Sequence, residues 1–466
     1  MNDDNKSPFK KQKLSHYKRV EYENIGRIDF SSYSRRSPTC KNPNSLVVYL
    51  LDGNFNKTYD VFNIQGITKD GHSVNAVVRD HEFGFYSGIP KKTNDVTEII
   101  KRMNLVVKNH IDPRDYRWRN RDRGEENPIL SLDIVKKTNV MNYNHPKEYL
   151  HWKVKSYGDI KLICKYMEEI YEVDDFYNVG NRGVGLDPIT SFQVETPNQN
   201  QIKFCSYVRL TNIHHFDSAK TTCQYNVNVS YKDIHMLKQE GNYFIPPPFK
   251  KLSFDIETIG TNPNEEGKVI QIGCYLEENK ETQKVIFVLD TSEGVEDTQV
   301  YCFRTETDLL KAFTKFVRQS DPDVLTGYNI DGFDLYFILE RAKILSIENE
   351  VSLLGRDGNK CVCIEMMGGS KQQGFKSKKN TKVNGRIDFD VFVVIDSIYK
   401  TKLDSLKLNF VSQYFLKNMQ KDDVHWKEIK PLQEGSDADR AKLAKYCIKD
   451  CVLPIELIDK KDLLNF

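Results

Sequence analysis

The sequence predicts two folded domains, a strand-rich α+β domain followed by an α/β domain. Three observations favour this fold class. Strand patterns mix with two helical patterns before residue 246, the stiff triple proline Pro246-Pro247-Pro248 follows, and a new series of strands and helices begins at residue 251. A chain of 466 residues is long enough for each domain to bury its own core. We therefore expect domains over residues 43–248 and 249–466.

The first 42 residues differ in composition from both domains. They contain many Ser and Asn residues, few aliphatic ones, and several basic residues, among them Lys6, Lys10, Lys11, Lys13, Lys18, Arg19, Arg35 and Arg36. So little apolar surface cannot offset the entropy of ordering the chain, and we expect a basic, disordered tail over residues 1–42. The lysine cluster at residues 9–13 is open to three interpretations: a nuclear-import signal, an arm that touches DNA, or a solvated segment.

Apolar patterning predicts the elements of the first domain. The expected strands lie at residues 46–51, 59–64 and 73–78, the last two around the turn Lys69-Asp70-Gly71. Apolar residues then recur at helical spacing over residues 94–109 and 159–171. Two helices among strands make an α+β domain.

The second domain begins with strands at residues 251–257, 269–276 and 284–290, and a polar loop between the last two favours an antiparallel meander. The elements that follow are a helix at 306–319, a strand at 324–328, a helix that starts after Asp331, a strand at 385–389, and helices at 405–417 and 437–452. Thr305 and Asp331 are placed to cap the first two of these helices. Strand-strand-strand-helix-strand-helix is the layout of a ribonuclease-H-like α/β core.

Two pairs of side chains in the second domain are spaced to act together. Asp255 and Glu257 are two residues apart in an apolar strand, so both project from one face while their apolar neighbours enter a core. Tyr446 and Asp450 are four residues apart in a helical segment and therefore share one helical face. With Asp334, these residues offer carboxylates from three different elements.

This set of carboxylates fits a defined chemistry. Hydrolysis of a phosphodiester needs an activated water, neutralisation of charge on the attacked phosphate and stabilisation of the leaving oxygen, and two divalent cations supply all three. Mg²⁺ or Mn²⁺ prefers such hard oxygen ligands. Each group alone has a plainer explanation, such as a solvent-facing strand edge, an acid at a helix start or the surface of an amphipathic helix. Their order and element types together indicate a two-metal nuclease.

The segments that carry these residues resemble the three exonuclease motifs of family B DNA polymerases, above all those of the DNA polymerase delta branch and its large-DNA-virus relatives. The matching segments are Phe254-Asp255-Ile256-Glu257, residues 327–334 and Tyr446-Cys447-Ile448-Lys449-Asp450. Similarity to the delta branch also extends to residues 269–272, 321–324, 399–409 and, more weakly, 67–86. The resemblance implies a 3′–5′ exonuclease that proofreads DNA synthesis during replication.

The resemblance also implies a role for each residue of the set. Asp255 would bridge both metals. Glu257 and Asp450 would complete the site that activates water, while Asp334 would serve the second metal, partly through water. Tyr446 would hydrogen-bond to the nucleophile and orient it.

Further residues are candidates for substrate contact. By the same resemblance, Asn329 and Phe333 would contact the 3′-terminal nucleotide and support the metal site, although plain core packing also explains Phe333. The segment at residues 370–382 contains five lysines, Lys378 and Lys379 among them, and no acid. It is either a DNA-facing loop whose lysines neutralise phosphates or a solvated flexible loop.

The metal-binding palm signatures of family B polymerases are absent, since the 466 residues contain neither a Ser-Leu-Tyr-Pro-Ser run nor an Asp-Thr-Asp triplet. We therefore expect the N-terminal and exonuclease part of a polymerase, either a split subunit or a truncated product, which does not polymerise alone. Its expected partners are DNA, as single-stranded 3′ ends and primer-template, and a palm-containing polymerase chain or the missing C-terminal part. The alternatives are a non-catalytic nucleic-acid-binding scaffold and an RNA-trimming exonuclease of the same class.

Composition sets the remaining limits. The net charge of +2 gives no global attraction to a polyanion, so DNA binding must depend on local basic segments. The 10 cysteines form no Cys-x-x-Cys pattern, which is typical of buried thiols in a reducing compartment rather than of a zinc site. Apolar runs fall far short of the roughly 20 residues of a spanning helix. We expect an intracellular protein without membrane association, in the nucleus or a viral replication compartment.

Overall fold

The computed structural model places most of the chain in two regions that have separate apolar cores. The described residues are 18–56, 61–90, 95–109, 129–138, 146–155, 157–173, 176–177, 202–238, 240–243, 245–264, 266–368, 376–417 and 424–464. One core is built from residues between Leu46 and Ile234, and the others are built mainly from residues after Leu252.

A six-stranded mixed sheet forms the centre of the C-terminal region, in the order β17-β15-β14-β13-β18-β21. Its strands are β13 (Lys251–Ile259), β14 (Lys268–Glu278), β15 (Glu281–Leu289), β17 (Thr298–Phe303), β18 (Val324–Gly327) and β21 (Ile387–Asp390). β14 pairs antiparallel with β13 and β15, which confirms the predicted meander. β13, β18 and β21 pair in parallel, and the result is the predicted ribonuclease-H-like sheet.

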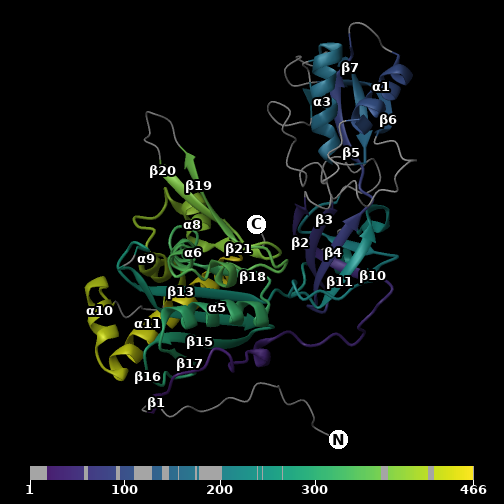
Figure 1. Cartoon of the computed structure of the whole chain (residues 1–466). Helices are drawn as coiled ribbons and strands as arrows, with labels where there is room; N and C mark the ends of the chain where they lie inside the picture. Colours follow the sequence, from purple (N-terminus) through teal and green to yellow (C-terminus); the bar gives the residue numbers. More distant parts are fainter. Residues whose placement is uncertain are drawn as a thin grey trace, which may run out of the picture.

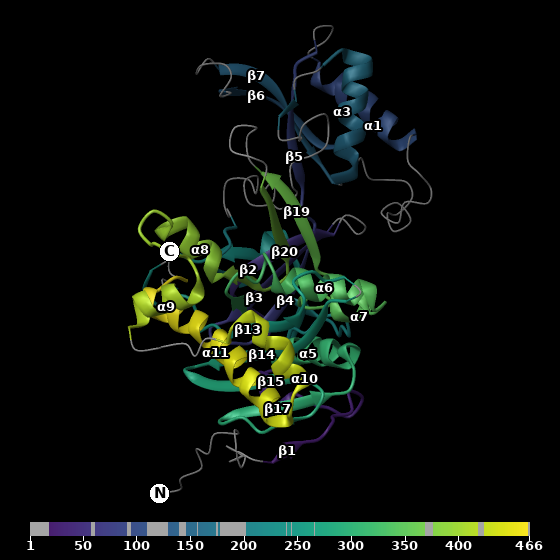
Figure 2. The same cartoon turned by 90° about the vertical axis from the view of Figure 1, so that its left-hand side faces the viewer.

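Helices cover both faces of this sheet. They are α5 (Glu306–Ser320), α6 (Asp334–Ile344), α7 (Glu348–Val351), α8 (Val391–Tyr399), α9 (Leu408–Leu416), α10 (Trp426–Glu434) and α11 (Asp437–Lys461). The apolar faces of α5 and α6 form one core with Leu252, Phe254 and Ile256 of β13. α11 packs on the opposite face with α8, α9 and α10 around it, and Figure 2 shows it lying across β13, β14 and β15. Because strand side chains alternate, the odd-numbered residues of β13 face α11.

The N-terminal region contains two further sheets. The first has the order β10-β11-β4-β3-β2-β9-β12, with β2 (Leu46–Asn56), β3 (Val61–Thr68), β4 (Ser73–Arg79), β9 (Tyr207–Leu210), β10 (His214–His215), β11 (Tyr225–Ser230) and β12 (Ile234–Met236). The second has the order β6-β7-β5-β8, with β5 (Phe83–Gly88), β6 (Ile129–Thr138), β7 (Pro146–Val154) and β8 (Phe176–Tyr177), beside α1 (Val96–Asn109) and α3 (Tyr157–Tyr171). Both predicted helices are confirmed. In Figure 1 the second sheet and its helices lie beyond the first sheet, away from the C-terminal region.

A hairpin projects from the C-terminal region beside α6 (Figures 1 and 2). It consists of β19 (Val362–Gly368) and β20 (Lys376–Lys382), paired antiparallel. The prediction of a loop over residues 370–382 is therefore wrong for residues 376–382, because a run of lysines lacks the apolar alternation that identifies a strand. The remainder of that predicted loop lies outside the described residues.

The segment before the first sheet is ordered against the C-terminal region. β1 (Arg19–Val20) pairs with β16 (Ser292–Glu293), and Phe30 is 0% exposed with its ring 5.4 Å from that of Phe316 on α5. The prediction of a disordered tail is wrong for residues 18–42, because a few apolar anchors in a polar segment are enough to dock it. Residues 1–17 lie outside the described part of the chain.

Two helix ends also differ from the predictions. α6 begins at Asp334 with Phe333 at the N-cap position and no side-chain cap, so the prediction that Asp331 caps this helix is wrong. α11 continues past the predicted end at residue 452 and through Pro454 to Lys461. The predicted Thr305 cap is confirmed, since its side chain accepts the backbone N–H of Asp308 at 3.1 Å. Among the described helices, none is both long and apolar enough to cross a membrane.

Five buried charges lie where the N-terminal region meets the six-stranded sheet. Arg35 contacts Asp323 at 2.6 Å, while Arg356 and Arg386 contact Asp321 at 2.8 and 2.9 Å. None of these side chains is more than 6% exposed. We call this set the arginine cluster. Because Arg35 also donates to the backbone carbonyl of Gly71, between β3 and β4, at 2.6 Å, the cluster joins the two regions.

The arginine cluster also sets where three strands begin. Asp323 lies directly before β18, and its side chain accepts the backbone N–H of Lys250, directly before β13, at 2.8 Å. Its backbone carbonyl accepts the N–H of Ile387, the first residue of β21, at 2.8 Å. The three parallel strands therefore start from one fixed point, and their other ends carry the candidate site.

Candidate active site

β13 carries two carboxylates on the face that α11 covers. Asp255 is half-buried and Glu257 is 5% exposed. One carboxylate oxygen of each lies within 4.8 Å of the other and of the Cys447 thiol on α11. The register of β13 against β14 shifts directly after Glu257, and such irregularities re-aim side chains near active sites. The structure thus brings the predicted pair together on one face.

Asp334 reaches the same strand from its edge. β18 pairs with β13 only over residues 251–253, so the rest of β13 extends beyond this parallel neighbour. There the buried Asp334 carboxylate accepts the backbone N–H of Ile256 at 3.0 Å. Ile256 lies between Asp255 and Glu257, so the third carboxylate is fixed beside the first two.

α11 brings Asp450 to this group, because its charge is among those that act on the Asp334 carboxyl. Cys447, on the same helix, has its Sγ 3.5 Å from the backbone carbonyl oxygen of Asp255. Asp450 is buried and Tyr446 is half-buried on the same helix. The structure therefore unites carboxylates from β13, the start of α6 and the middle of α11, whereas Tyr446 packs against Ile270, Leu432 and Leu443 and its role toward water remains a prediction.

The close approach of α11 depends on a glycine. Gly273 of β14 pairs with Asp255, and a Cβ added to it would lie 2.8 Å from Cys451 Sγ and 2.9 Å from Cys447 Sγ. Heavy atoms cannot approach so closely without moving the helix. Gly273 and the two small thiol side chains therefore let α11 lie directly against the sheet beside the carboxylates. Spacing rules did not identify this role, although an isolated glycine inside a strand is a known signal of close backbone approach.

A further acid holds the turn between β18 and α6. The Asp390 carboxylate accepts the backbone N–H of Asn329 at 2.8 Å and that of Asp331 at 3.2 Å. It also caps α8 by accepting the N–H of Phe392 at 2.9 Å. Sequence reasoning missed Asp390, yet an Asp directly before the apolar run at residues 391–395 is an N-cap signal.

Asn329 has the backbone conformation that this turn requires. Its φ of 67° lies in the left-handed region, which Asn tolerates better than most residues. The following Gly332 leaves room for its side chain, because a Cβ there would lie 2.3 Å from Asn329 Oδ1. Asn329, the predicted substrate contact, is therefore positioned by its own backbone conformation and by the space that Gly332 leaves for its side chain.

The electrostatics of the group favour cations. Burial, together with the charges of Asp390 and Asp450, raises the pKa of the Asp334 carboxyl from 3.8 to about 8. Crowded buried carboxylates take up protons unless a positive charge compensates them. Burial also raises the pKa of the Cys447 thiol well above 9.0, so this thiol stays protonated and adds no soft ligand. The oxygen donor set fits hard divalent cations.

Comparison with known proteins agrees with this geometry. Residues 187–411 match the family described as DNA polymerase family B, exonuclease domain. The chain carries a family B DNA polymerase exonuclease domain. Asp255, Glu257, Asn329 and Asp334 lie inside the matched residues. Tyr446 and Asp450 lie beyond the matched residues, on α11. The fold packs this helix against β13, where the other carboxylates lie.

Relatives of the exonuclease domain include DNA polymerase delta catalytic subunits. Those of Plasmodium falciparum and Drosophila melanogaster are 31% and 32% identical, each over 86% of this chain and 37% of the relative. That of Schizosaccharomyces pombe is 36% identical over 60% of this chain and 26% of the relative. The chain thus spans between 26% and 37% of the length of these relatives.

The fold of a solved family B polymerase is also similar. The enzyme from the hyperthermophilic archaeon Pyrobaculum calidifontis aligns with a TM-score of 0.59 at 17% identity, over 89% of this chain and 46% of that chain. At this identity the likeness supports the fold alone. The N-terminal region and the exonuclease domain together therefore have the architecture of that part of a family B polymerase.

The remaining predicted substrate residues lie around α6 of the exonuclease domain. Phe333 is half-buried with its ring 5.4 Å from that of Phe337, so it packs against the α6 core. Lys379 of β20 places its ammonium 3.2 Å from the ring centre of Tyr336, which attaches the hairpin to α6. The side chain of Lys378 lies outside the described residues. Contact of these lysines with DNA remains a prediction.

Proposed function

We propose that this exonuclease domain hydrolyses single-stranded DNA from its 3′ end with two divalent cations, Mg²⁺ or Mn²⁺, and so proofreads the product of a family B polymerase. One observation carries the proposal. Asp334 accepts the N–H of Ile256, which lies between the two carboxylates of β13, while α11 presents Cys447 to Asp255 and places the charge of Asp450 beside Asp334. A surface group of acids would have no reason to converge from three elements.

The residues of the chain have distinct tasks in this proposal. Asp255, Glu257, Asp334 and Asp450 would hold the cations, which supply an activated water and neutralise the attacked phosphate when bound. Tyr446, on the same helical face as Asp450, orients the attacking water through its hydroxyl. Asp390 keeps the turn that carries Asn329 in place against the terminal nucleotide. Burial of the carboxylates keeps bulk water from screening their charges.

The test is the double variant Asp255→Ala with Glu257→Ala. We expect release of nucleotides from a 3′-labelled single strand to fall by orders of magnitude, since the cations lose two ligands. Thermal unfolding should be unchanged or occur at a higher temperature, because the variant has fewer crowded negative charges. Glu350→Ala is the matched control, as this carboxylate on α7 is exposed and pairs with Lys311 at 2.7 Å, away from the candidate site. Near-wild-type activity in the double variant would reject the assignment.

The same assay separates the alternatives. An RNA-trimming exonuclease would degrade an RNA strand of the same sequence faster than the DNA strand, and we expect the reverse. A non-catalytic scaffold would release no nucleotides with either cation, whatever the strand. Calorimetry with Mg²⁺ and Mn²⁺ on the wild-type chain and the double variant identifies the cation that the carboxylates bind.

We further propose that the substrate in replication is the primer end of a primer-template and that a palm-containing polymerase chain or segment is the partner. The place of action would then be the nucleus or a viral replication compartment. Adding a palm-containing partner should direct cleavage toward mismatched primer ends. Equal cleavage of matched and mismatched ends in its presence would contradict the proofreading role.

A further inference from the structure

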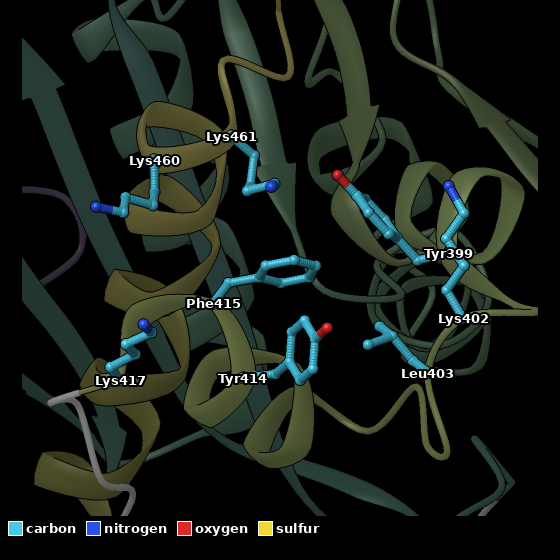
Figure 3. A pocket seen from close by; sticks show the side chains of 8 residues that line it. All are labelled: Tyr399, Lys402, Leu403, Tyr414, Phe415, Lys417, Lys460 and Lys461. Atoms are coloured by element: carbon cyan, nitrogen blue, oxygen red, sulfur yellow. The ribbon is translucent and has the colours of Figure 1, made fainter.

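A second candidate site lies at the C-terminal end of α11, between that helix, α8 and α9. It is a pocket of about 410 Å³. The residues that line it are Tyr399, Lys402, Leu403, Tyr414, Phe415, Lys417, Lys460 and Lys461, none of which is acidic. Figure 3 shows the rings of Tyr399, Tyr414 and Phe415 in the middle of the pocket, with lysines of α11 and of the segments that follow α8 and α9 around them. None of these residues takes part in the candidate active site.

The rings form a platform that is partly open to solvent. The ring of Phe415 meets those of Tyr399 and Tyr414 edge to face, at centroid distances of 5.0 and 4.9 Å. Tyr414 is 57% exposed, although a tyrosine is usually buried in large part. An exposed ring among basic residues is the arrangement on which nucleic-acid bases stack.

The lysines of this pocket are available to bind an anion. Lys461 places its ammonium 4.6 Å from the ring centre of Phe415, and Lys402 places its own 5.7 Å from that of Tyr399. Such cation–π contacts at exposed sites are weak enough to be exchanged for a phosphate. In the described part of the chain, no ion pair involves any of the four lysines that line the pocket. The chain as a whole has a net charge of only +2, so the positive charge is local.

We propose that this pocket binds single-stranded DNA, with a base against Tyr414 and backbone phosphates at the lysines. The rings favour a nucleic acid over an acidic peptide, because every base has a flat aromatic face that stacks on a ring, whereas the side chains of Asp and Glu have none. The inference rests on the proposed function, since the strand bound here is the one whose 3′ end is hydrolysed. We call this site the strand pocket.

The strand pocket is placed to hold the substrate upstream of its end. Asp450 and Lys460 are on one continuous helix, α11, and at 1.5 Å per residue their ten-residue separation corresponds to about 15 Å. If the last nucleotide of a strand lies at the carboxylates, the nucleotide that reaches the strand pocket must be one further from the 3′ end. A dinucleotide is too short to contact both places.

Binding to the strand pocket is measured by fluorescence anisotropy with labelled oligothymidylate of about 12 nucleotides, in EDTA so that hydrolysis is absent. The charge-reversal variant is Lys402→Glu with Lys461→Glu. Because each phosphate contact to a single strand contributes about 0.7 to the slope of log affinity against log salt, we expect the slope to fall by about 1.4. Tyr414→Ala should weaken binding by roughly fivefold or more, as loss of one stacked base does.

Lys343→Glu is the matched control. This lysine of α6 is 52% exposed and undergoes the same charge reversal outside the pocket, so it should leave affinity and slope unchanged. Wild-type affinity and slope in the charge-reversal variant and in Tyr414→Ala would overturn the proposal. Pocket variants that lose affinity for polyglutamate but keep affinity for oligothymidylate would also overturn it, in favour of an acidic peptide.

A length series separates this inference from the proposed function. Pocket variants should hydrolyse a dinucleotide like the wild-type chain and show a raised KM only for longer strands. A wild-type chain that hydrolyses neither length would refute the exonuclease proposal while the binding measured in EDTA still decides the pocket. Equal KM changes for the dinucleotide and the longer strand would show that the pocket variants act through the active site, against the inference.

Discussion

Replacing Asp321 with Asn removes one of two negative charges from the arginine cluster that joins the two regions. In the native chain the guanidinium groups of Arg35, Arg356 and Arg386 surround Asp321 and Asp323. Burial alone would raise the pKa of Asp321, but the charge of Arg356 and then those of the other two arginines lower it well below 3.8. The native carboxylate is therefore ionised at neutral pH, and the variant leaves three buried positive charges against one.

The structure sets the size of the effect. Asp321 lies 2.8 Å from Arg356 Nε and 2.9 Å from Arg386 Nη1 through Oδ1, and 3.1 Å from Arg35 Nε through Oδ2, so one substitution weakens three buried ion pairs. Breaking a buried pair by removing one partner costs about 3–5 kcal/mol. Each kcal/mol lowers the midpoint of thermal unfolding by about 2–4 °C in a domain of roughly 150–250 residues. We therefore expect the midpoint to fall by about 6–20 °C.

Thermal unfolding followed by circular dichroism measures this change. Asp70→Asn is the control, because Asp70 is exposed in the turn before Gly71 and should change the free energy of unfolding by at most about 0.5 kcal/mol. Since the folded-state pKa of Asp321 is lowered, its stabilising effect is present above the unfolded value of 3.8 and is lost as the pH falls below it. The difference between wild type and variant should shrink accordingly below about pH 4. A midpoint within about 2 °C of wild type at neutral pH would refute the reasoning.

Three further substitutions test the candidate active site. Tyr446→Phe removes only a hydroxyl, so the exonuclease rate should fall by about 10²–10⁴ while calorimetry still detects Mn²⁺ binding, and loss of that binding would contradict the role of the phenol. Gly273→Ala places a Cβ 2.8 Å from Cys451 Sγ, so urea unfolding should show a loss of about 1–3 kcal/mol together with lower activity, whereas unchanged stability would mean that α11 does not need this close approach. Asp390→Ala removes the acceptor for the N–H of Asn329, so KM for single strands should rise, and an unaltered KM would show that the turn holds itself.

Local patterns predicted the elements that carry the site. The alternation around Asp255 and Glu257 predicted a strand with both acids on one face, and the periodicity of residues 306–319 together with Thr305 predicted α5 and its cap. These predictions depend on side chains close in sequence, which fix strand faces and helix starts without reference to the rest of the chain. The grouping of the carboxylates was inferred instead from their order and element types along the chain, together with the resemblance to known motifs.

Long-range contacts account for what the sequence could not predict. Phe30 lies in a polar segment, and only its docking against α5 shows that residues 18–42 are ordered. Asp331 has the sequence of a cap, yet α6 starts three residues later because the backbone N–H groups of the turn bind Asp390, distant in sequence. Local sequence preferences cannot predict a hydrogen-bond acceptor that lies on a strand distant in sequence, as Asp390 does.

The arginine cluster and the candidate active site occupy opposite ends of the same three parallel strands. β18 has only 4 residues, so at about 3.3 Å per residue the two ends are separated by roughly 13 Å. A shift by one residue at the start of β18 would turn its side chains to the other face and move the turn that carries Asn329 and Asp334. Buried charges with fixed partners tolerate such a shift less well than an apolar contact, because each displaced carboxylate would leave a guanidinium uncompensated. The cluster therefore sets the register of the strands on which the distance between Asp334 and β13 depends.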